Sequence, residues 1–486
     1  MTFQEILDKI LYYVEKLDKN ILWGVWTTIF ITFVYLFFTV KSRFYQFTNI
    51  GYILKNTFGK VFDKTKAREK GSMTPFQATT TALASTVGMG SIAGVATALS
   101  IGGPGAIFWM WLFAAIGMVV KTAEITLAVH YRDIDREGNI HGGPMYYIQK
   151  GLGWTPLAKV FSVSMFINAV FCASLLQSHT VGRSFLGSYN INPYLVTGAM
   201  AIVTAIVVIG GVKRIGQVCE RLVPLMSLVY VAGGLFLFAY NYSAIPEVFG
   251  SIFVYAFKPF SAVGGAAGVV VLSTIQKMMI TLQTGVSRGM LVNEAGLGTA
   301  PMVHSTADTS HPFKQGLWGS FEVCVVTFII CTITAFAILS TGVLGNGQTG
   351  IELVITAFSE VFPENMAKLL ISFSILTFCL STQIGFFIYY ETAVYTAFGK
   401  KSMIFLKWFY FIPAIIFAGV GDVDKLWTFA NIAVAVCAIP NLIAVLLLNN
   451  AFFKLMKDYL GGENKYATAI IDKTKEYVRR PNNNAH

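Results

Sequence analysis

The sequence alternates long apolar runs with short polar segments. A helix that crosses the hydrocarbon core of a bilayer needs about 20 predominantly apolar residues. Eleven runs meet this requirement, at residues 21–41, 76–100, 104–131, 156–181, 193–211, 218–240, 263–300, 314–342, 366–398, 402–420 and 425–449. The pattern therefore predicts an all-α polytopic membrane protein with eleven transmembrane helices. The run at 263–300 is too long and too interrupted for one straight helix, so we expect a break inside it.

Composition and charge agree with this class of protein. Charged residues make up only 13% of the chain, against roughly 25% in a soluble domain. Basic residues gather in the loops at 42–75, 132–159, 213–221 and 400–407 and in the tail, whereas the 343–365 loop has three glutamates and no Lys or Arg. Since cytoplasmic loops are enriched in Lys and Arg, we expect a cell-membrane protein with its N-terminus outside and its C-terminus in the cytoplasm. The net charge of +11 sits at segment ends and does not indicate a nucleic-acid partner.

The runs divide the chain into parts. Apolar residues between 3 and 17 repeat at helical spacing among charged ones, so residues 1–41 are predicted to form an interfacial helix followed by an extra transmembrane helix. Residues 42–75 form a basic cytoplasmic loop, and residues 450–486 a cytoplasmic tail. The ten remaining runs fall into five within 76–240 and five within 263–449. The two halves open with helices that enter from opposite sides, as an inverted-topology repeat requires.

Enzyme signatures are missing from the sequence. The six cysteines lie in apolar runs without metal-ligand or redox spacing, and the histidines are scattered. The glycine-rich phosphate loop of many ATP-driven proteins is absent as well. We therefore expect no enzyme, but a monomeric membrane protein whose surroundings are the lipid bilayer.

The middle of the second run combines glycine with hydroxyl groups. Gly88 and Gly90 lie among Ser85, Thr86 and Ser91, and each glycine costs a helix about 1 kcal/mol relative to alanine. The alternative interpretation is that small residues only let membrane helices pack closely. We favour a break, because opened backbone at membrane depth is tolerated where it lines a polar cavity.

A helix interrupted at membrane depth exposes the ends of two half-helices. The carbonyls at the end of the first half suit a cation, and the amides at the start of the second suit a carboxylate. The opening run of the second half carries its own glycines, namely Gly285, Gly289, Gly296 and Gly298. Two such helices predict a site that holds Na⁺ beside an amino-acid carboxylate.

Other polar residues inside apolar runs are candidates for the same site. The amide of Gln177 could bind a polar group of a substrate or join two helices. The hydroxyls of Ser381 and Thr382 could bind a small cation or a carbonyl of their own helix. Arg288 with Glu294 resembles a cytoplasmic gate or helix latch more than a substrate ligand.

Charge pairing is also expected within the third run. Lys121 and Glu124 are three residues apart, so they can pair on one face of a helix.

Several phrases of the sequence resemble the alanine or glycine:cation symporter family, which belongs to the amino acid–polyamine–organocation superfamily. They lie at residues 73–78, 81–84, 92–96, 102–111, 142–147, 293–301 and 438–442, and so span most of the chain. The resemblance implies a five-plus-five inverted repeat of the leucine-transporter type with one extra N-terminal helix. It also implies Na⁺-coupled symport of small neutral amino acids such as alanine and glycine by alternating access, with Na⁺ preferred to H⁺.

The resemblance also assigns roles to individual positions. The segment from Gly88 to Ser91 is expected to receive the substrate carboxylate. The substrate-binding set that we predict is Thr86, Gly88, Met89, Gly90, Ser91, Gln177, Gly285, Gly289, Thr382 and Phe386. The predicted Na⁺ ligands are Ala84, Val87, Phe378, Ser381 and Thr382, the first three through their carbonyl groups.

The sequence departs from the family pattern at the pocket. The family usually has GTGN at the break, where this chain has GMGS at 88–91, and a Trp where Phe386 stands. Phenylalanine leaves more room than tryptophan, and Gln383 adds an amide close by. Glutamine or another neutral amino acid is therefore an alternative main substrate, and a non-coupled channel or sensor is an alternative function.

Overall fold

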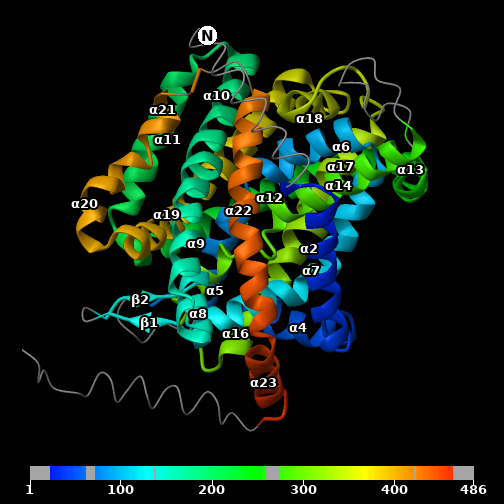
Figure 1. Cartoon of the computed structure of the whole chain (residues 1–486). Helices are drawn as coiled ribbons and strands as arrows, with labels where there is room; N and C mark the ends of the chain where they lie inside the picture. The colour runs from blue at the N-terminus through cyan, green and yellow to red at the C-terminus, as the bar shows by residue number, and fades with distance from the viewer. Residues whose placement is uncertain are drawn as a thin grey trace, which may run out of the picture.

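A computed structural model describes residues 22–61, 72–135, 138–258, 260, 273–416, 418–419 and 423–462. The predicted N-terminal surface helix and most of the predicted cytoplasmic tail lie outside these residues. The described part of the chain is a bundle of helices with one short hairpin, in which β1 (Asp133–Ile134) pairs antiparallel with β2 (Ile140–His141) (Figure 1).

Helices follow one another through the described chain with short connections. The elements up to residue 257 are α2 (Val25–Lys41), α3 (Tyr45–Thr48), α4 (Ile50–Asn56), η2 (Phe58–Lys60), α5 (Pro75–Thr86), η3 (Gly90–Gly94), α6 (Val95–Gly102), α7 (Gly105–His130), α8 (Pro144–Leu152), α9 (Thr155–Asn168), η4 (Ala169–Leu175), α10 (Leu176–Tyr189), α11 (Pro193–Val208), α12 (Gly211–Tyr240), η5 (Tyr242–Ala244) and α13 (Ile245–Phe257). The elements that follow are α14 (Thr274–Asn293), α15 (Ala300–His304), α16 (Pro312–Val323), η7 (Cys324–Cys331), α17 (Thr332–Ser340), α18 (Gly350–Ser359), α19 (Glu364–Phe398), α20 (Lys400–Phe409), α21 (Ile412–Ile416), α22 (Val423–Leu447) and α23 (Asn449–Leu460).

The described helices agree with a polytopic membrane protein. Six helical segments are long and apolar enough to cross a membrane, and a bent pair formed by α5 and residues 90–102 makes a seventh. The predicted runs at 21–41 and 193–211 correspond to shorter helices, α2 with 17 residues and α11 with 16. The run at 402–420 was expected to be one helix, but α20 and α21 divide it. The number of eleven crossings and the inverted repeat stay predictions.

The first predicted break is confirmed. Helix α5 begins with a capping box, in which the hydroxyl of Thr74 and the side chain of Gln77 each accept from the other residue's backbone N–H. It ends at Thr86, because Val87 has a non-helical ψ of 78°. The chain resumes as the π-helical turn η3 and continues as α6, with a bend of 52° between the two halves. A π-helical turn in such a position often marks a functional site.

The second predicted break exists, but it lies further along the chain than Gly285 and Gly289. Helix α14 runs without interruption through both glycines and ends at Asn293. A β-carbon on Gly285 would lie 2.5 Å from Cβ of Trp109, so this glycine lets α14 pack tightly against α7. The expectation that these two glycines interrupt the helix was therefore wrong.

Residues 294–299 form the observed break between α14 and α15. Glu294 is left-handed, with a φ of 55°, and Gly296 and Gly298 have φ of 79° and 82°. A left-handed backbone costs a non-glycine residue energy, so glycines are favoured at the last two positions. The break is thus determined by Gly296 and Gly298, the last two of the four glycines predicted to matter in this run.

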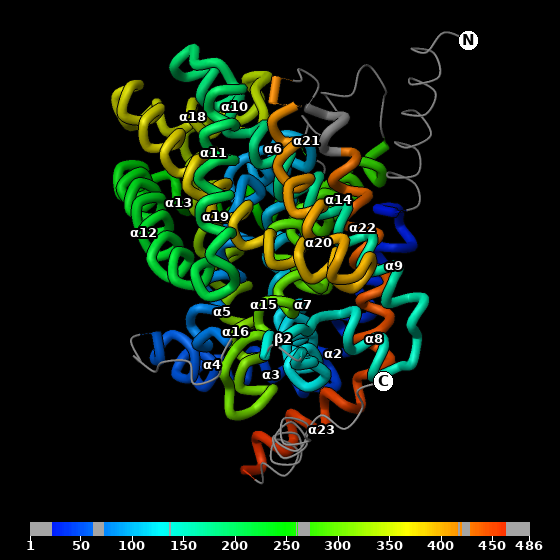
Figure 2. Tube along the Cα trace, turned by 90° about the vertical axis from the view of Figure 1, so that its left-hand side faces the viewer, coloured from blue at the N-terminus to red at the C-terminus, as the bar shows by residue number. Residues whose placement is uncertain are grey.

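The broken helices lie at the centre of the bundle. Helix α7 packs along both α14 and α16, while α19 packs along α5, α9, α10 and α12. In Figure 2, α6, α10 and α18 lie toward one end of the bundle, and α4, α8, α23 and β2 toward the other. Both breaks are therefore enclosed by neighbouring helices rather than exposed on the outside.

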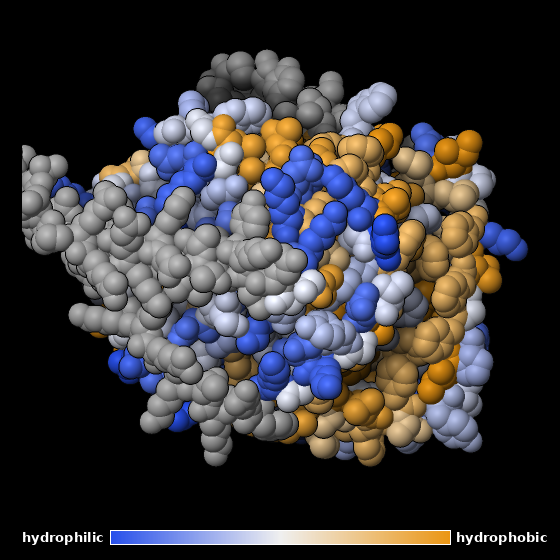
Figure 3. All heavy atoms as spheres, turned by 90° about the horizontal axis from the view of Figure 1, so that it is seen from below, coloured by the Kyte–Doolittle hydropathy of each residue, from blue (hydrophilic) through white to orange (hydrophobic). Residues whose placement is uncertain are grey.

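The outer surface of the bundle is apolar where lipid would contact it. Large hydrophobic side chains are exposed on α11, α12 and α20, including Ile202, Leu228 and Phe405. The end that carries α4, α8 and α23 differs, because hydrophilic side chains gather there beside a hydrophobic border (Figure 3). An apolar belt with a polar end is the surface expected of a membrane-embedded protein.

Candidate functional site

A cavity lies where the two breaks face each other. The empty space that it encloses together with its opening amounts to about 440 Å³. It is lined by Ser85, Thr86, Gly88, Met89, Gly90, Asn168, Cys172, Leu176, Gln177, Leu291, Glu294, Leu297, Phe386 and Val434. These residues come from both broken helices, from α9, η4 and α10, and from α19 and α22. The two breaks thus contribute to one chamber, as the sequence predicted.

Two predicted residues from distant parts of the chain, Gln177 and Thr382, converge on Gly88. A β-carbon on Gly88 would lie 2.5 Å from Oγ1 of Thr382 and 3.1 Å from Oε1 of Gln177. The same Oε1 accepts a hydrogen bond from the backbone N–H of Met89, at 3.1 Å. Glycine is needed at position 88 because any side chain would displace one of the two polar groups. Gln177 therefore orients the start of the second half-helix.

Oxygen atoms gather at the end of the first half-helix. Oγ1 of Thr382 lies 3.0 Å from the carbonyl oxygen of Ala84 and 2.9 Å from that of Phe378. Oγ of Ser381 lies 3.3 Å and 2.8 Å from the same two carbonyls. Carbonyl and hydroxyl oxygens are the ligands that small hard cations prefer. Four of the five predicted Na⁺ ligands thus lie together, and the fifth, Val87, is the buried residue that directly follows α5.

The other predicted substrate residues divide into two groups. Thr86, Met89, Gly90 and Phe386 line the cavity beside Gly88 and Gln177.

Ser91, Gly285 and Gly289 are not among the residues that line the cavity within the described part of the chain. The Ser91 carbonyl accepts from the hydroxyl of Thr334, at 2.9 Å. Gly289 would place a β-carbon 3.4 Å from Cα of Met110 on α7. These three residues serve helix packing in the structure.

Gln383 does not add an amide to the pocket, contrary to the expectation from the sequence. Its Nε2 donates to the hydroxyl of Ser178, at 2.6 Å, and to the carbonyl of Ser174, at 3.1 Å. Its Oε1 accepts from the hydroxyl of Thr204, at 3.2 Å. Both ends of the amide are thus used in joining α19 to η4, α10 and α11. The presence of Gln383 consequently gives no support to a glutamine substrate.

Glu294 lines the cavity, which the sequence interpretation as a cytoplasmic latch missed. It is buried, and its Oε2 accepts from the hydroxyl of Thr299, at 2.5 Å. The signal in the sequence was an acidic residue two positions before Gly296, since an ionisable group inside a membrane is a functional candidate by default. Asn168 is a second polar lining residue that the sequence did not reveal.

Side chains from three helices hold the backbone of the second break. Nζ of Lys121 donates to the carbonyl of Asn293, at 2.6 Å, and the hydroxyl of Tyr35 donates to that of Ala295, at 2.6 Å. The N–H of Gly296 donates to Oε2 of Glu124, at 3.1 Å. Unwound backbone inside a membrane needs such partners, because each unsatisfied group there costs several kcal/mol.

Two further bonds complete this arrangement around Gly296. Asn441 of α22 donates from Nδ2 to the Gly296 carbonyl, at 2.9 Å, and also to Glu124. Glu124 is thereby used in holding the break. The Lys121–Glu124 pair expected on one face of α7 is replaced by an ion pair between Lys121 and Glu322, at 3.4 Å.

The model of the sodium:alanine symporter family matches residues 7–473. The chain belongs to the sodium:alanine symporter family. The resemblance noted from the sequence phrases is therefore confirmed.

Curated members of the sodium:alanine symporter family match over most of their length. The uncharacterized transporter YflA of Bacillus subtilis (strain 168) is 37% identical, over 97% of this chain and 98% of the relative. The sodium/alanine symporter AgcS of Methanococcus maripaludis is 34% identical, over 89% of this chain and 93% of the relative. The probable sodium/glutamine symporter GlnT of Bacillus subtilis (strain 168) is 33% identical, over 93% of this chain and 91% of the relative. Members of the sodium:alanine symporter family thus carry names with different substrates.

Proposed function

We propose that this protein is a Na⁺-coupled symporter that imports small neutral amino acids, with alanine and glycine as the first candidates. The observation that carries the proposal is the convergence of Ala84, Phe378, Ser381 and Thr382 oxygens beside a cavity lined by both broken helices. Symport requires the ion and the substrate to bind together, and the two groups of atoms meet where Thr382, of the ion group, lies against Gly88, which lines the cavity.

The proposed Na⁺ site fits the chemistry of its ligands. The Ala84 carbonyl accepts from the hydroxyls of Ser381 and Thr382 across the space between α5 and α19. The Phe378 carbonyl accepts from the same two hydroxyls within α19. The hydroxyls of Ser381 and Thr382 can turn their protons away and offer lone pairs to a cation. The C-terminal end of the α5 half-helix adds a partial negative charge. These features favour a small cation without an acidic ligand.

The proposed substrate site complements both charges of an amino acid. The second half-helix begins at Gly90, and the positive end of its dipole favours a carboxylate there. The N–H groups of Gly88 and Met89 already donate to Thr86 and Gln177, so the dipole and the Gly90 N–H would receive the substrate carboxylate. We place the substrate ammonium group toward Glu294, the acidic residue in the lining. Phe386 then forms an apolar wall for the side chain. The bulk of that wall should limit the length of the substrate.

Glutamine is the alternative substrate. It is supported by the match to a relative named as a probable sodium/glutamine symporter and by Phe386 in place of the family's tryptophan. The alanine hypothesis is supported by the match to AgcS and by the absence of the Gln383 amide from the cavity lining. A test of the function therefore has to compare alanine with glutamine directly.

Alternating access follows from the same proposal. A protein with eleven crossings and two inverted five-helix halves would expose the cavity to each side of the membrane in turn. We propose a monomer in the cell membrane, with its N-terminus outside and its C-terminus in the cytoplasm. A channel on the same scaffold is less favoured, because two broken helices provide no ring of identical pore residues.

Uptake into proteoliposomes tests the function. Vesicles with an inward Na⁺ gradient and a negative interior are given labelled alanine, glycine or glutamine, each with the others as competitors. Accumulation above the external concentration, lost when K⁺ replaces Na⁺, is expected of a symporter. Equilibration without accumulation would instead indicate a channel. Failure of all neutral amino acids to bind or move would contradict the proposal.

A further inference from the structure

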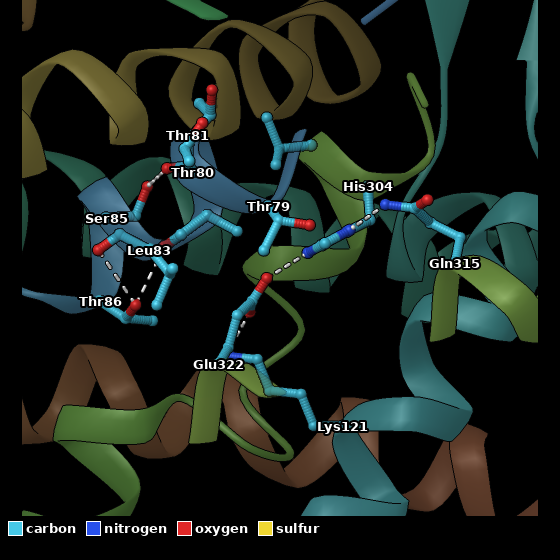
Figure 4. A network of polar contacts seen from close by, with 12 residues as sticks. Thr79, Thr80, Thr81, Leu83, Ser85, Thr86, Lys121, His304, Gln315 and Glu322 are labelled. Carbon is cyan, nitrogen blue, oxygen red and sulfur yellow. Dashed lines mark hydrogen bonds and ion pairs between the residues drawn. The ribbon is translucent and has the colours of Figure 1, made fainter. Parts of the chain in front are cut away.

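A buried cluster of ionisable side chains lies beside the second break (Figure 4). It joins Lys121 of α7, His304 at the end of α15, and Gln315 and Glu322 of α16, each 0% exposed. Nε2 of His304 lies 2.5 Å from Oε1 of Glu322, and the other oxygen of Glu322 lies 3.4 Å from Nζ of Lys121. The four residues are separate from those that line the cavity in the described chain.

The contacts of His304 determine where its proton lies. Nε2 of Gln315 lies 2.8 Å from Nδ1 of His304. Since an amide nitrogen only donates, Nδ1 must accept, and the neutral imidazole carries its proton on Nε2, toward Glu322. The amide oxygen of Gln315 and Oε2 of Glu322 have no hydrogen-bond partner among the described residues, although both are buried.

These two oxygens suit an additional proton on His304. If Nδ1 becomes protonated, a half-turn of the Gln315 amide presents its oxygen as the acceptor. The carboxylate of Glu322 then lies between an imidazolium and the ammonium group of Lys121. An ionised carboxylate at hydrogen-bond distance favours the protonated imidazole, and histidine is the side chain that ordinarily exchanges a proton between about pH 5 and 8.

Ionisable groups lie on several elements near the cluster. Helix α5, which packs against α15, contributes no ionisable side chain. Helix α7 carries Lys121 and Glu124, the break carries Glu294, α16 carries Glu322 and α19 carries Tyr389. Arg132, just beyond α7, donates to the carbonyls of Ser305 and Ala307, at 3.1 and 2.8 Å. The carboxylate that contacts His304 is that of Glu322, so Glu322 is the group that would stabilise an imidazolium at this position.

We propose that His304, with Glu322 and Gln315, forms a proton-binding site that is separate from the Na⁺ site and linked to substrate binding. The link rests on the proposed function. Lys121 pairs with Glu322 and also holds the carbonyl of Asn293, and the next residue, Glu294, lines the cavity. A substrate ammonium group at Glu294 removes negative charge from the surroundings of His304. Substrate binding therefore expels the proton from His304.

Nitrogen NMR of the full-length protein in lipid, with its six histidines labelled, tests the site. The signal that disappears in His304→Gln is the signal of His304. If that variant does not fold, replacing the other five histidines one at a time identifies the signal of His304 by elimination. We expect His304 to gain a second proton as the pH is lowered across the range in which the protein stays folded. Addition of alanine or glutamine with Na⁺ should return it toward the neutral form, and Glu322→Gln should keep it neutral throughout.

His141→Gln is the matched control, because His141 contacts Asp135 outside the cluster, at 3.2 Å. It should leave the His304 signal unchanged. A His304 signal that stays in one protonation state across this pH range overturns the site. A signal that titrates but ignores every transported amino acid overturns the link. If the unmodified protein shows no Na⁺-driven accumulation, the proposed function is wrong. Protonation of His304 would still be a valid result in that case.

Discussion

Replacing Gly88 by alanine tests the shared ion and substrate site. The added β-carbon would lie 2.5 Å from Oγ1 of Thr382, a separation that real β-carbons essentially never show. The backbone of Gly88 is not left-handed, so alanine introduces no conformational strain of that kind. The effect should come from steric overlap with Thr382 and, at 3.1 Å, with Gln177.

The size of the effect follows from what Thr382 loses. Its hydroxyl lies within hydrogen-bond distance of two carbonyls that we assign to Na⁺. Displacing a buried hydroxyl from its partners costs about 1–3 kcal/mol, which corresponds to a factor of about 5–150 in an equilibrium constant. We therefore expect Gly88→Ala to raise the Na⁺ concentration for half-maximal alanine uptake by roughly this factor. Initial uptake rates in proteoliposomes, measured against external Na⁺, provide the value.

Gly94→Ala is the control, because Gly94 ends the π-helical turn η3 that follows the break and a β-carbon there meets nothing within 4 Å. It should leave the Na⁺ dependence unchanged. Since Gly88→Ala acts through Thr382, adding it to Thr382→Ala should cost much less than it does alone. Equal effects at positions 88 and 94, or penalties that simply add in the double variant, would refute the reasoning.

Further predictions concern the other residues of the site. Thr382→Ala removes a proposed Na⁺ ligand and should raise half-saturating Na⁺ at least about fivefold; an unchanged ion dependence would exclude this ligand. Gln177→Ala loses the bond to the Met89 N–H and should raise the apparent KM for substrate about three- to tenfold, with Na⁺ dependence retained; unaltered uptake would place the pocket elsewhere. Glu294→Gln should weaken binding of amino acids but leave Na⁺ binding without substrate intact, which calorimetry can separate. Gly285→Ala should lower the melting temperature in detergent, since its β-carbon would lie 2.6 Å from the carbonyl of Ala106. Gly289→Ala, with its nearest contact at 3.4 Å, should change it little, and equal losses would contradict the packing role.

The sequence predicted the first break because its signal is local. Gly88, Gly90 and the hydroxyls around them lower helix stability wherever the chain is placed. The run at 263–300 carries two pairs of glycines, which lower helix stability equally, and only tertiary packing distinguishes the two pairs. Gly285 is held in a continuous helix by close contact with α7, whereas Gly296 and Gly298 adopt left-handed conformations. Local propensity alone could not choose between the pairs.

Side-chain direction was the second limit of the sequence. Gln383 follows Thr382 directly, yet one residue along a helix turns by about 100°, so Gln383 leaves the cavity and joins three other helices. Glu294 is the opposite case, because the left-handed turn at that residue brings its carboxyl group into the lining. The sequence also could not give the number of helices, because a hydropathy pattern joins short apolar elements such as α20 and α21 into one run.

The bonds that fix residues 293–296 have a consequence for how the molecule can move. Tyr35, Lys121, Glu124 and Asn441 tie this short stretch to α2, α7 and α22, so these parts should travel as one rigid body. Helix α2, which the sequence predicts to lie outside the two five-helix halves, would then stiffen that body. Rocking during a transport cycle would have to take place along surfaces with fewer hydrogen bonds between helices. Removing the Tyr35 hydroxyl should loosen the attachment of α2 to the second break.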